Sequence, residues 1–298
     1  MFRITVDVYS GRPNPVIEIS NDDEIRSTLR QLSANRSLAT AEPPAEGGLG
    51  LRGFQLEIMD DELARRYDLA GSLYIPAGAA TAEFTERLTS LAMSGNALAV
   101  PGFEEQTTFD EGLRDYLLGQ LERSSSGTVQ EGSDKQEPAT ADAVCYYDFY
   151  AFNPGFWNDN STTLWNNNCY NYASNWRTNT FAQPGRGCGN VWKAITAAEV
   201  TRAALCDGMH RRYDCFPDTE KPRNLVALVI APGPAFIDYH WYRYHQGGFW
   251  GHKPGGTAAR NVDNSNQTIT NPETADRGPY TIFAGYFYGC DSQRRRIR

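Results

Sequence analysis

Residues 238–253 read DYHWYRYHQGGFWGHK, and this stretch decides how the second half of the 298-residue chain folds. Two runs rich in aromatic residues flank the turn formers at 246–248, a pattern that predicts a β-hairpin. If the hairpin closes on those three residues, His240 and His252 lie at most two positions apart in register. Because alternate side chains of a strand share one face, these imidazoles can meet, whereas His245 is expected on the opposite face, at the surface.

Two further patterns stand upstream of the hairpin. Residues 224–230 form a continuous apolar run of strand length. Residues 166–173 read NNNCYNYA, and the three asparagines predict a helix capped by Asn167 or Asn168, with Cys169 in its first turn. A helix N-terminus stabilises a thiolate, so we expect a lowered pKa for the Cys169 thiol.

A thiol, a base and an orienting group together make a nucleophilic site. One imidazole of the histidine pair would take the thiol proton, and the other would fix the tautomer of the first. This order of residues resembles the NlpC-type cysteine peptidases, a papain-superfamily group best known for cutting bacterial cell-wall peptides. The resemblance covers residues 166–265. It implies a papain-like α+β domain, in which a helix carrying the cysteine packs on an antiparallel sheet carrying the histidine.

The resemblance assigns roles position by position. It implies Cys169 as nucleophile, His240 as base and His252 as the residue that orients the base. A tyrosine upstream of the cysteine commonly helps to bind the oxyanion in the family, and Tyr146 or Tyr147 could serve. Further cleft candidates are the direct neighbours of the nucleophile and the base, Asn168 and Trp241.

The chain departs from the family at both motifs. It has Asn-Cys-Tyr-Asn at 168–171 where the family usually has Asp-Cys-Ser-Gly, and Tyr-His-Trp-Tyr at 239–242 where the family has Gly-His-Val-Gly. The aromatic side chains beside the base make a larger lining than the family usually has. This difference affects the expected substrate more than the expected fold.

Other cysteines and a metal site offer alternative interpretations. Cys206 and Cys215 are expected to form a disulfide or to be two inert thiols, and Cys188 with Cys290 is a weaker candidate for a disulfide. Cys145 is expected to be buried in the core. Cys169, His240 and His252 could instead hold zinc, but the usual ligand spacings are absent. We therefore expect neither a metal nor another cofactor.

The first part of the chain is a different kind of domain. It has no Cys, His or Trp through residue 142. Strands at 2–9, 14–19, 53–59 and 72–76 alternate with helices that start at Asn21 and span 82–93 and 109–122, which predicts an α+β domain over 1–123 for recognition or placement. Residues 124–142 cannot bury enough apolar surface to fold, so we interpret them as a flexible linker before the hydrolase domain, 143–298.

Charge and hydropathy exclude two classes of partner. The chain carries a formal net charge of −8, and residues 1–142 hold 24 acidic against 12 basic residues, so we expect no nucleic-acid binding. No apolar run is long enough to span a membrane. The N-terminus alternates like a strand, which predicts a cytoplasmic protein or one exported without a cleavable signal peptide.

These patterns favour a cysteine hydrolase that cleaves an amide bond through an acyl-enzyme on Cys169. The substrate would be a peptide, an isopeptide or a peptidoglycan stem peptide, and the first domain could contact a protein partner. One alternative is an acyltransferase of the transglutaminase type on the same site. Another is a secreted effector or toxin that keeps the fold but acts by binding. The sequence specifies neither the substrate nor the oligomeric state.

Overall fold

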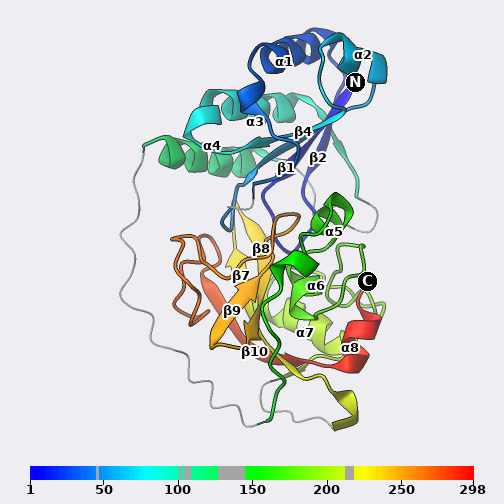
Figure 1. Cartoon of the computed structure of the whole chain (residues 1–298), viewed down its shortest axis with the longest axis vertical. Coiled ribbons are helices and arrows are strands. Elements are labelled where there is room, and N and C mark those ends of the chain that lie inside the picture. Colours follow the sequence, from blue (N-terminus) through cyan, green and yellow to red (C-terminus); the bar gives the residue numbers. More distant parts are fainter. Residues whose placement is uncertain (45–46, 101–102, 104–108, 127–144, 212–217) are drawn as a thin grey trace. The chain divides into compact units, whose positions relative to one another are not determined.

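The computed structural model describes residues 1–44, 47–100, 103, 109–126, 145–211 and 218–298 (Figure 1). The chain folds as two compact units. The first unit consists of Met1–Tyr9, Pro13–Pro44 and Leu51–Val129, and the second of Ser10–Arg12, Ala45–Gly50 and Gln130–Arg298.

Two short segments depart from the predicted domains. Ser10–Arg12 and Ala45–Gly50 belong to the second unit, although the sequence places them within the first domain. Residues 127–142 of the predicted linker lie outside the described residues, and 124–126 end a helix.

The first unit contains an antiparallel five-stranded sheet of order β4-β3-β1-β2-β5. Phe2 pairs with Ile19, so the predicted N-terminal hairpin is confirmed. The side chain of Asn21 accepts hydrogen bonds from two backbone amides and caps the first helix, as predicted. The elements are β1 Phe2–Asp7, β2 Val16–Ile19, α1 Asp22–Ala34, β3 Gly53–Ile58, α2 Asp61–Arg66, β4 Ser72–Pro76, α3 Ala82–Ser94, β5 Asn96–Leu98 and α4 Glu111–Ser126.

A buried ion pair fixes the end of β1. The Asp7 carboxylate accepts hydrogen bonds from Arg52 Nη2 at 2.6 Å, the Tyr74 hydroxyl at 2.9 Å and Asn14 Nδ2 at 3.1 Å. A buried carboxylate is tolerated only when it is paired and hydrogen-bonded in this way. The network therefore holds the chain on both sides of Ser10–Arg12.

The second unit contains an antiparallel five-stranded sheet of order β6-β10-β7-β8-β9. The apolar run becomes β7, whose first eight residues are all buried, so it forms the core of the unit. The predicted hairpin is confirmed, since His245 pairs with Phe249 and Tyr242 pairs with His252. The strands are β6 His210–Arg211, β7 Asn224–Pro232, β8 Ile237–His245, β9 Phe249–His252 and β10 Ile282–Gly289.

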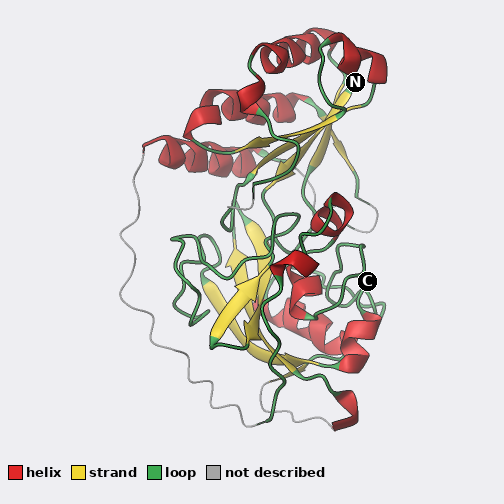
Figure 2. Ribbon diagram, viewed as in Figure 1, coloured by secondary structure: helices red, strands yellow, loops and turns green. Residues whose placement is uncertain are grey.

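Helices of the second unit are short except for one. Figure 2 shows them beside the sheet, and α6 packs directly on β8. They are α5 Ser161–Asn166, α6 Cys169–Ala173, α7 Ala197–Asp207 and α8 Asp291–Arg296. Both units combine helices with an antiparallel sheet, so the α+β class is confirmed. Within the described residues, no helix has the length and apolarity needed to cross a bilayer.

Candidate functional site

Cys169 opens α6, as the asparagine run predicts. The side chain of Asn168 accepts hydrogen bonds from the backbone amides of Tyr170 and Asn171, and the Asn171 side chain returns one to the Asn168 amide. This reciprocal capping box fixes the helix start. Cys169 is a free cysteine and is fully buried.

The expected activation of the thiol is wrong for this conformation. Burial raises the pKa of the Cys169 thiol well above its usual value, the charge of Asp238 adds to the rise, and the backbone amide of Trp241 opposes it. A helix of five residues offers a weak dipole, while complete removal from water strongly disfavours a thiolate. The thiol is therefore protonated while the site is closed.

The two histidines meet as the hairpin register predicts. His240 Nε2 lies 2.8 Å from His252 Nδ1, and His252 Nε2 lies 3.0 Å from the Val262 carbonyl oxygen. Burial lowers the pKa of His252 to about 3, so its ring is neutral. The carbonyl can only accept, which places the His252 proton on Nε2 and makes Nδ1 the acceptor. His240 then donates from Nε2, and the basic nitrogen of a neutral His240 is Nδ1.

The thiol approaches β8 at its backbone. Trp241 contacts Tyr170 with ring centroids 5.7 Å apart, and Arg243 donates to the Tyr172 carbonyl, so α6 lies on the face of β8 that carries these two side chains. His240 shares the other face with Tyr242, its T-shaped ring neighbour at 4.8 Å. Along β8, β9 pairs with residues 242–245, so this pairing stops short of the His240–Trp241 peptide beside the sulfur.

A backbone carbonyl occupies a cradle formed by residues around the thiol. The Gly11 carbonyl oxygen accepts hydrogen bonds from Gln183 Nε2 at 2.8 Å and Asn168 Nδ2 at 2.9 Å, and the Tyr239 hydroxyl lies 3.0 Å away. The carbonyl residue Gly11 and its three partners are all buried. The sequence does not predict that Gln183 and Tyr239 bind this carbonyl, because no local pattern connects them with residue 11.

The amide groups of the same turn are held by a single carboxylate. Asp238 accepts hydrogen bonds from the backbone amides of Ser10 at 2.6 Å, Arg12 at 3.0 Å and Gly11, and from the Tyr280 hydroxyl at 2.5 Å. Burial raises the pKa of Asp238, and these donors oppose the rise. A β-carbon at Gly11 would lie 2.4 Å from the Tyr239 carbonyl oxygen, so only glycine fits here.

The two upstream tyrosines lie elsewhere. Tyr146 is 66% exposed, and the Tyr147 ring packs against Tyr244 with centroids 6.0 Å apart. Tyr244 is four residues beyond His240 on β8, which is roughly 13 Å along a strand. The structure therefore places Asn168, and not Tyr147, next to the carbonyl in the cradle.

His245 is not at the surface. It faces away from His240, as predicted, but it is fully buried under α6, with Nε2 2.7 Å from the Tyr172 hydroxyl. Its Nδ1 lies 3.2 Å from the Tyr150 carbonyl, so Nδ1 donates and Nε2 accepts. Burial, followed by the charge of Arg243, lowers the pKa of His245 to about 4.

The predicted disulfide pairings are wrong. Cys188 is bonded to Cys206, which excludes Cys206–Cys215 and Cys188–Cys290. Cys290 is a free, buried thiol, and Cys145 is buried and disulfide-bonded. Cys215 lies outside the described residues. Among those described, no group of three His, Cys, Asp or Glu side chains is arranged to hold a metal ion.

Comparison with known proteins gives one informative match. The chain is similar to insoluble matrix shell protein 1 from Ruditapes philippinarum, with 47% identity over 135 residues, which is 45% of this chain and 86% of the shell protein. No family model matches the chain. No solved structure matches it either.

Proposed function

The chain belongs to the family of insoluble matrix shell protein 1, and we propose that it is a cysteine hydrolase of papain-like arrangement that cleaves an amide bond through Cys169. The Gly11 carbonyl in its cradle is the observation that carries this proposal. It is an amide carbonyl, held by two side-chain amides and a hydroxyl beside the residue that opens α6. Donors aimed at a carbonyl oxygen are what an acyl-transfer enzyme needs to stabilise an oxyanion.

The proposed reaction uses the tautomers assigned above. His240 Nδ1 takes the thiol proton, and the Cys169 sulfur forms a bond to the substrate carbonyl carbon. The C–N bond then breaks, and the departing nitrogen receives the proton from His240. Water attacks the thioester, loses a proton to His240 and releases the acid together with the restored thiol. His252 keeps the base nitrogen of His240 at Nδ1 throughout.

In this proposal the structure is a closed resting state. Ser10–Arg12 occupies the place of a substrate segment, with its carbonyl in the cradle and its amides on Asp238. The site opens when this turn leaves. Water then reaches the Cys169 sulfur, which removes the burial that raises its pKa. The same movement exposes the edge of β8, where the sulfur must reach His240.

The name of the relative favours a second candidate, a matrix protein that acts by binding. The Cys188–Cys206 disulfide supports an oxidising compartment for either role. Retention of the biological effect by Cys169→Ser would favour binding. Products formed with and without an added amine separate hydrolysis from acyl transfer.

Gly11→Ala is expected to raise the rate at which a thiol-reactive electrophile labels Cys169. The added methyl group overlaps the Tyr239 carbonyl and displaces the turn. A tenfold increase needs only about 1.4 kcal/mol of destabilisation of the closed state, so we expect a tenfold change or more. The measurement is the labelling rate of the full-length protein near neutral pH, read by peptide mass spectrometry.

Gly71→Ala is the matched control, because a β-carbon there meets nothing within 4 Å, and it should label like the wild type. The buried thiol of Cys290 serves as an internal reference. Adding His240→Ala to Gly11→Ala should slow the labelling of Cys169 again. A folded Gly11→Ala protein that labels at the wild-type rate, or fast labelling that is indifferent to His240, would count against the proposal.

A further inference from the structure

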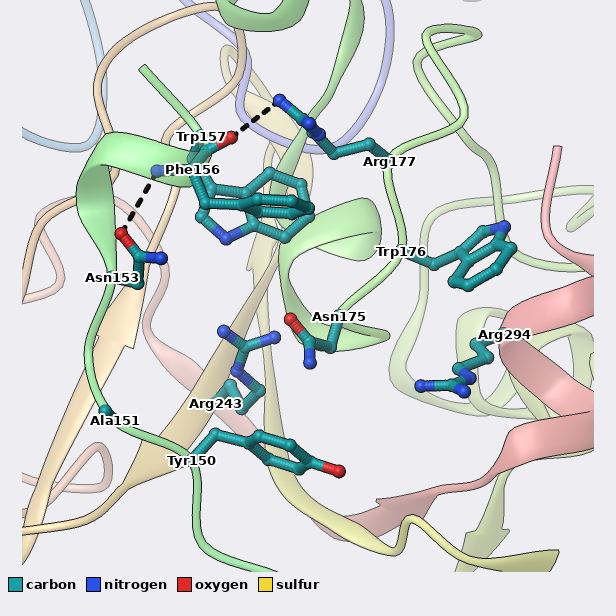
Figure 3. A pocket seen from close by; sticks show the side chains of 10 residues that line it. All are labelled: Tyr150, Ala151, Asn153, Phe156, Trp157, Asn175, Trp176, Arg177, Arg243 and Arg294. Atoms are coloured by element: carbon teal, nitrogen blue, oxygen red, sulfur yellow. Dashed lines mark hydrogen bonds between the residues drawn. The ribbon is translucent and has the colours of Figure 1, made fainter. Parts of the chain in front are cut away.

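A pocket of about 510 Å³ lies on the α6 side of β8. Figure 3 shows the Arg243 guanidinium between the side chains of Asn153 and Asn175, with Trp176 and Arg294 side by side at one end. The proposed catalytic residues are absent from its lining, which consists of Tyr150, Ala151, Asn153, Phe156, Trp157, Asn175, Trp176, Arg177, Arg243 and Arg294.

Arg243 is a buried cation without a carboxylate partner in the described part of the chain. It is 3% exposed, donates from Nη1 to the Tyr172 carbonyl at 2.7 Å and lies over the Tyr172 ring, while its Nε makes no hydrogen bond. Burial lowers its pKa. An uncompensated buried charge is costly, which points to an anion that completes the site.

The other two arginines of the pocket each have a carboxylate partner. Arg177 pairs with Asp159 at 2.8 Å, and Arg294 pairs at 2.8 Å with Asp291, which it shares with Arg295. Among the described residues Arg243 is therefore the guanidinium of the pocket that lacks a carboxylate, and its planar fork matches one.

The remaining lining is suited to the body of a sugar. Trp176 and Phe156 line the pocket and are each 40% exposed. The Arg177 guanidinium lies over the Phe156 ring at 3.8 Å and the Arg294 guanidinium over the Trp176 ring at 5.2 Å. We assign Trp176, the ring with the more distant cation, as the platform for a sugar ring. The amides of Asn153 and Asn175 can both donate to and accept from hydroxyl groups.

We propose that this pocket binds a carboxylated sugar, with the carboxylate on Arg243 and one face of the sugar ring on Trp176. The pocket volume falls within the usual range for small-molecule sites. The inference does not depend on the proposed hydrolase, because it uses no residue of the cysteine site.

The test measures binding of a short oligoglucuronate to the full-length protein by calorimetry. The same oligosaccharide with its carboxylates reduced to alcohols, and a benzoate that offers a carboxylate on an aromatic ring, are the comparison ligands. We expect the reduced sugar to bind about tenfold more weakly or worse, since it loses a charge-assisted fork. Benzoate should also bind more weakly, because it lacks the hydroxyls that the two asparagines recognise.

Three variants locate the site. Arg243→Gln and Trp176→Ala should each weaken oligoglucuronate binding by about fivefold or more. Phe149→Ala is the control, because it removes a ring that is 54% exposed and outside the pocket, and it should bind normally. If Arg243→Gln does not fold, Arg243→Lys retains the charge, loses the fork and should still bind more weakly. Equal affinity for the reduced sugar, unchanged affinity in Trp176→Ala, or no binding by the wild type would overturn the proposal.

Discussion

Asp238→Ala is expected to lower the free energy of unfolding of the second unit by about 3 kcal/mol, because it leaves buried donors without their acceptor, each at a cost of roughly 1–3 kcal/mol. Three of these donors are backbone amides of Ser10–Arg12, and the fourth is the Tyr280 hydroxyl. The same change should speed labelling of Cys169, since it loosens the turn that covers the cradle.

Denaturant unfolding followed by tryptophan fluorescence measures this effect. All six tryptophans belong to the second unit, so the signal reports on that unit alone. Asp159→Ala is a matched control in the same unit, because its carboxylate is exposed and pairs only at the surface with Arg177. Asp238→Asn retains one acceptor oxygen and should fall between the wild type and Asp238→Ala. A loss no larger than that of the control would show that the turn is held by other contacts.

Acidification from about pH 7 to about pH 5 is expected to destabilise the second unit by about 2 kcal/mol through each of two buried histidines. Burial lowers the pKa of His245 to about 4 and that of His252 to about 3. The unfolded chain protonates both near pH 6.5, while the folded chain does not. The stabilisation is therefore complete above that pH and is lost progressively as the pH falls towards the folded values. Asp207 and Asp238, whose pKa values burial raises, act in the opposite direction.

A substitution separates the histidines from the other acid-sensitive groups. His245→Gln should remove the contribution of His245, about 2 kcal/mol between these two pH values, because glutamine does not titrate. Gln246→Ala, which changes an exposed, non-titrating side chain next to His245, is the control and should leave the pH dependence unchanged. A His245→Gln protein with the same pH dependence as the wild type would contradict the assignment of a neutral, buried imidazole at this position.

Local rules predict the parts of the site that depend on short stretches of chain. The turn at 246–248 and the two-residue period of strands are sufficient to bring His240 to His252. The asparagine run is sufficient to place Cys169 at a helix start. The state of the thiol is different, because it depends on which segments cover it.

Those covering contacts join residues far apart in the sequence. Asn168 and Gly11 are separated by 157 positions, and Asp238 and Gly11 by 227. Gly11 lies in an ordinary turn sequence, so nothing local distinguishes it from the other glycines. The disulfide shows the same limit, because spacing alone does not decide that Cys188 pairs with Cys206. The sequence pattern also does not predict β10. The register shift between Phe283 and Gly285 interrupts the alternation of side chains that marks a strand.

The assignment of Ser10–Arg12 to the second unit changes what a fragment of this protein would be. A piece comprising residues 143–298 has every catalytic candidate but lacks the tripeptide whose amides bind Asp238 and whose carbonyl binds Gln183. In such a piece Cys169 would be uncovered, and the polar groups that bind the tripeptide would lack their partners. A protease cut between residues 127 and 144 would leave the tripeptide in place, because residues 10–12 lie on the other product of the cut and would still hold the two pieces together.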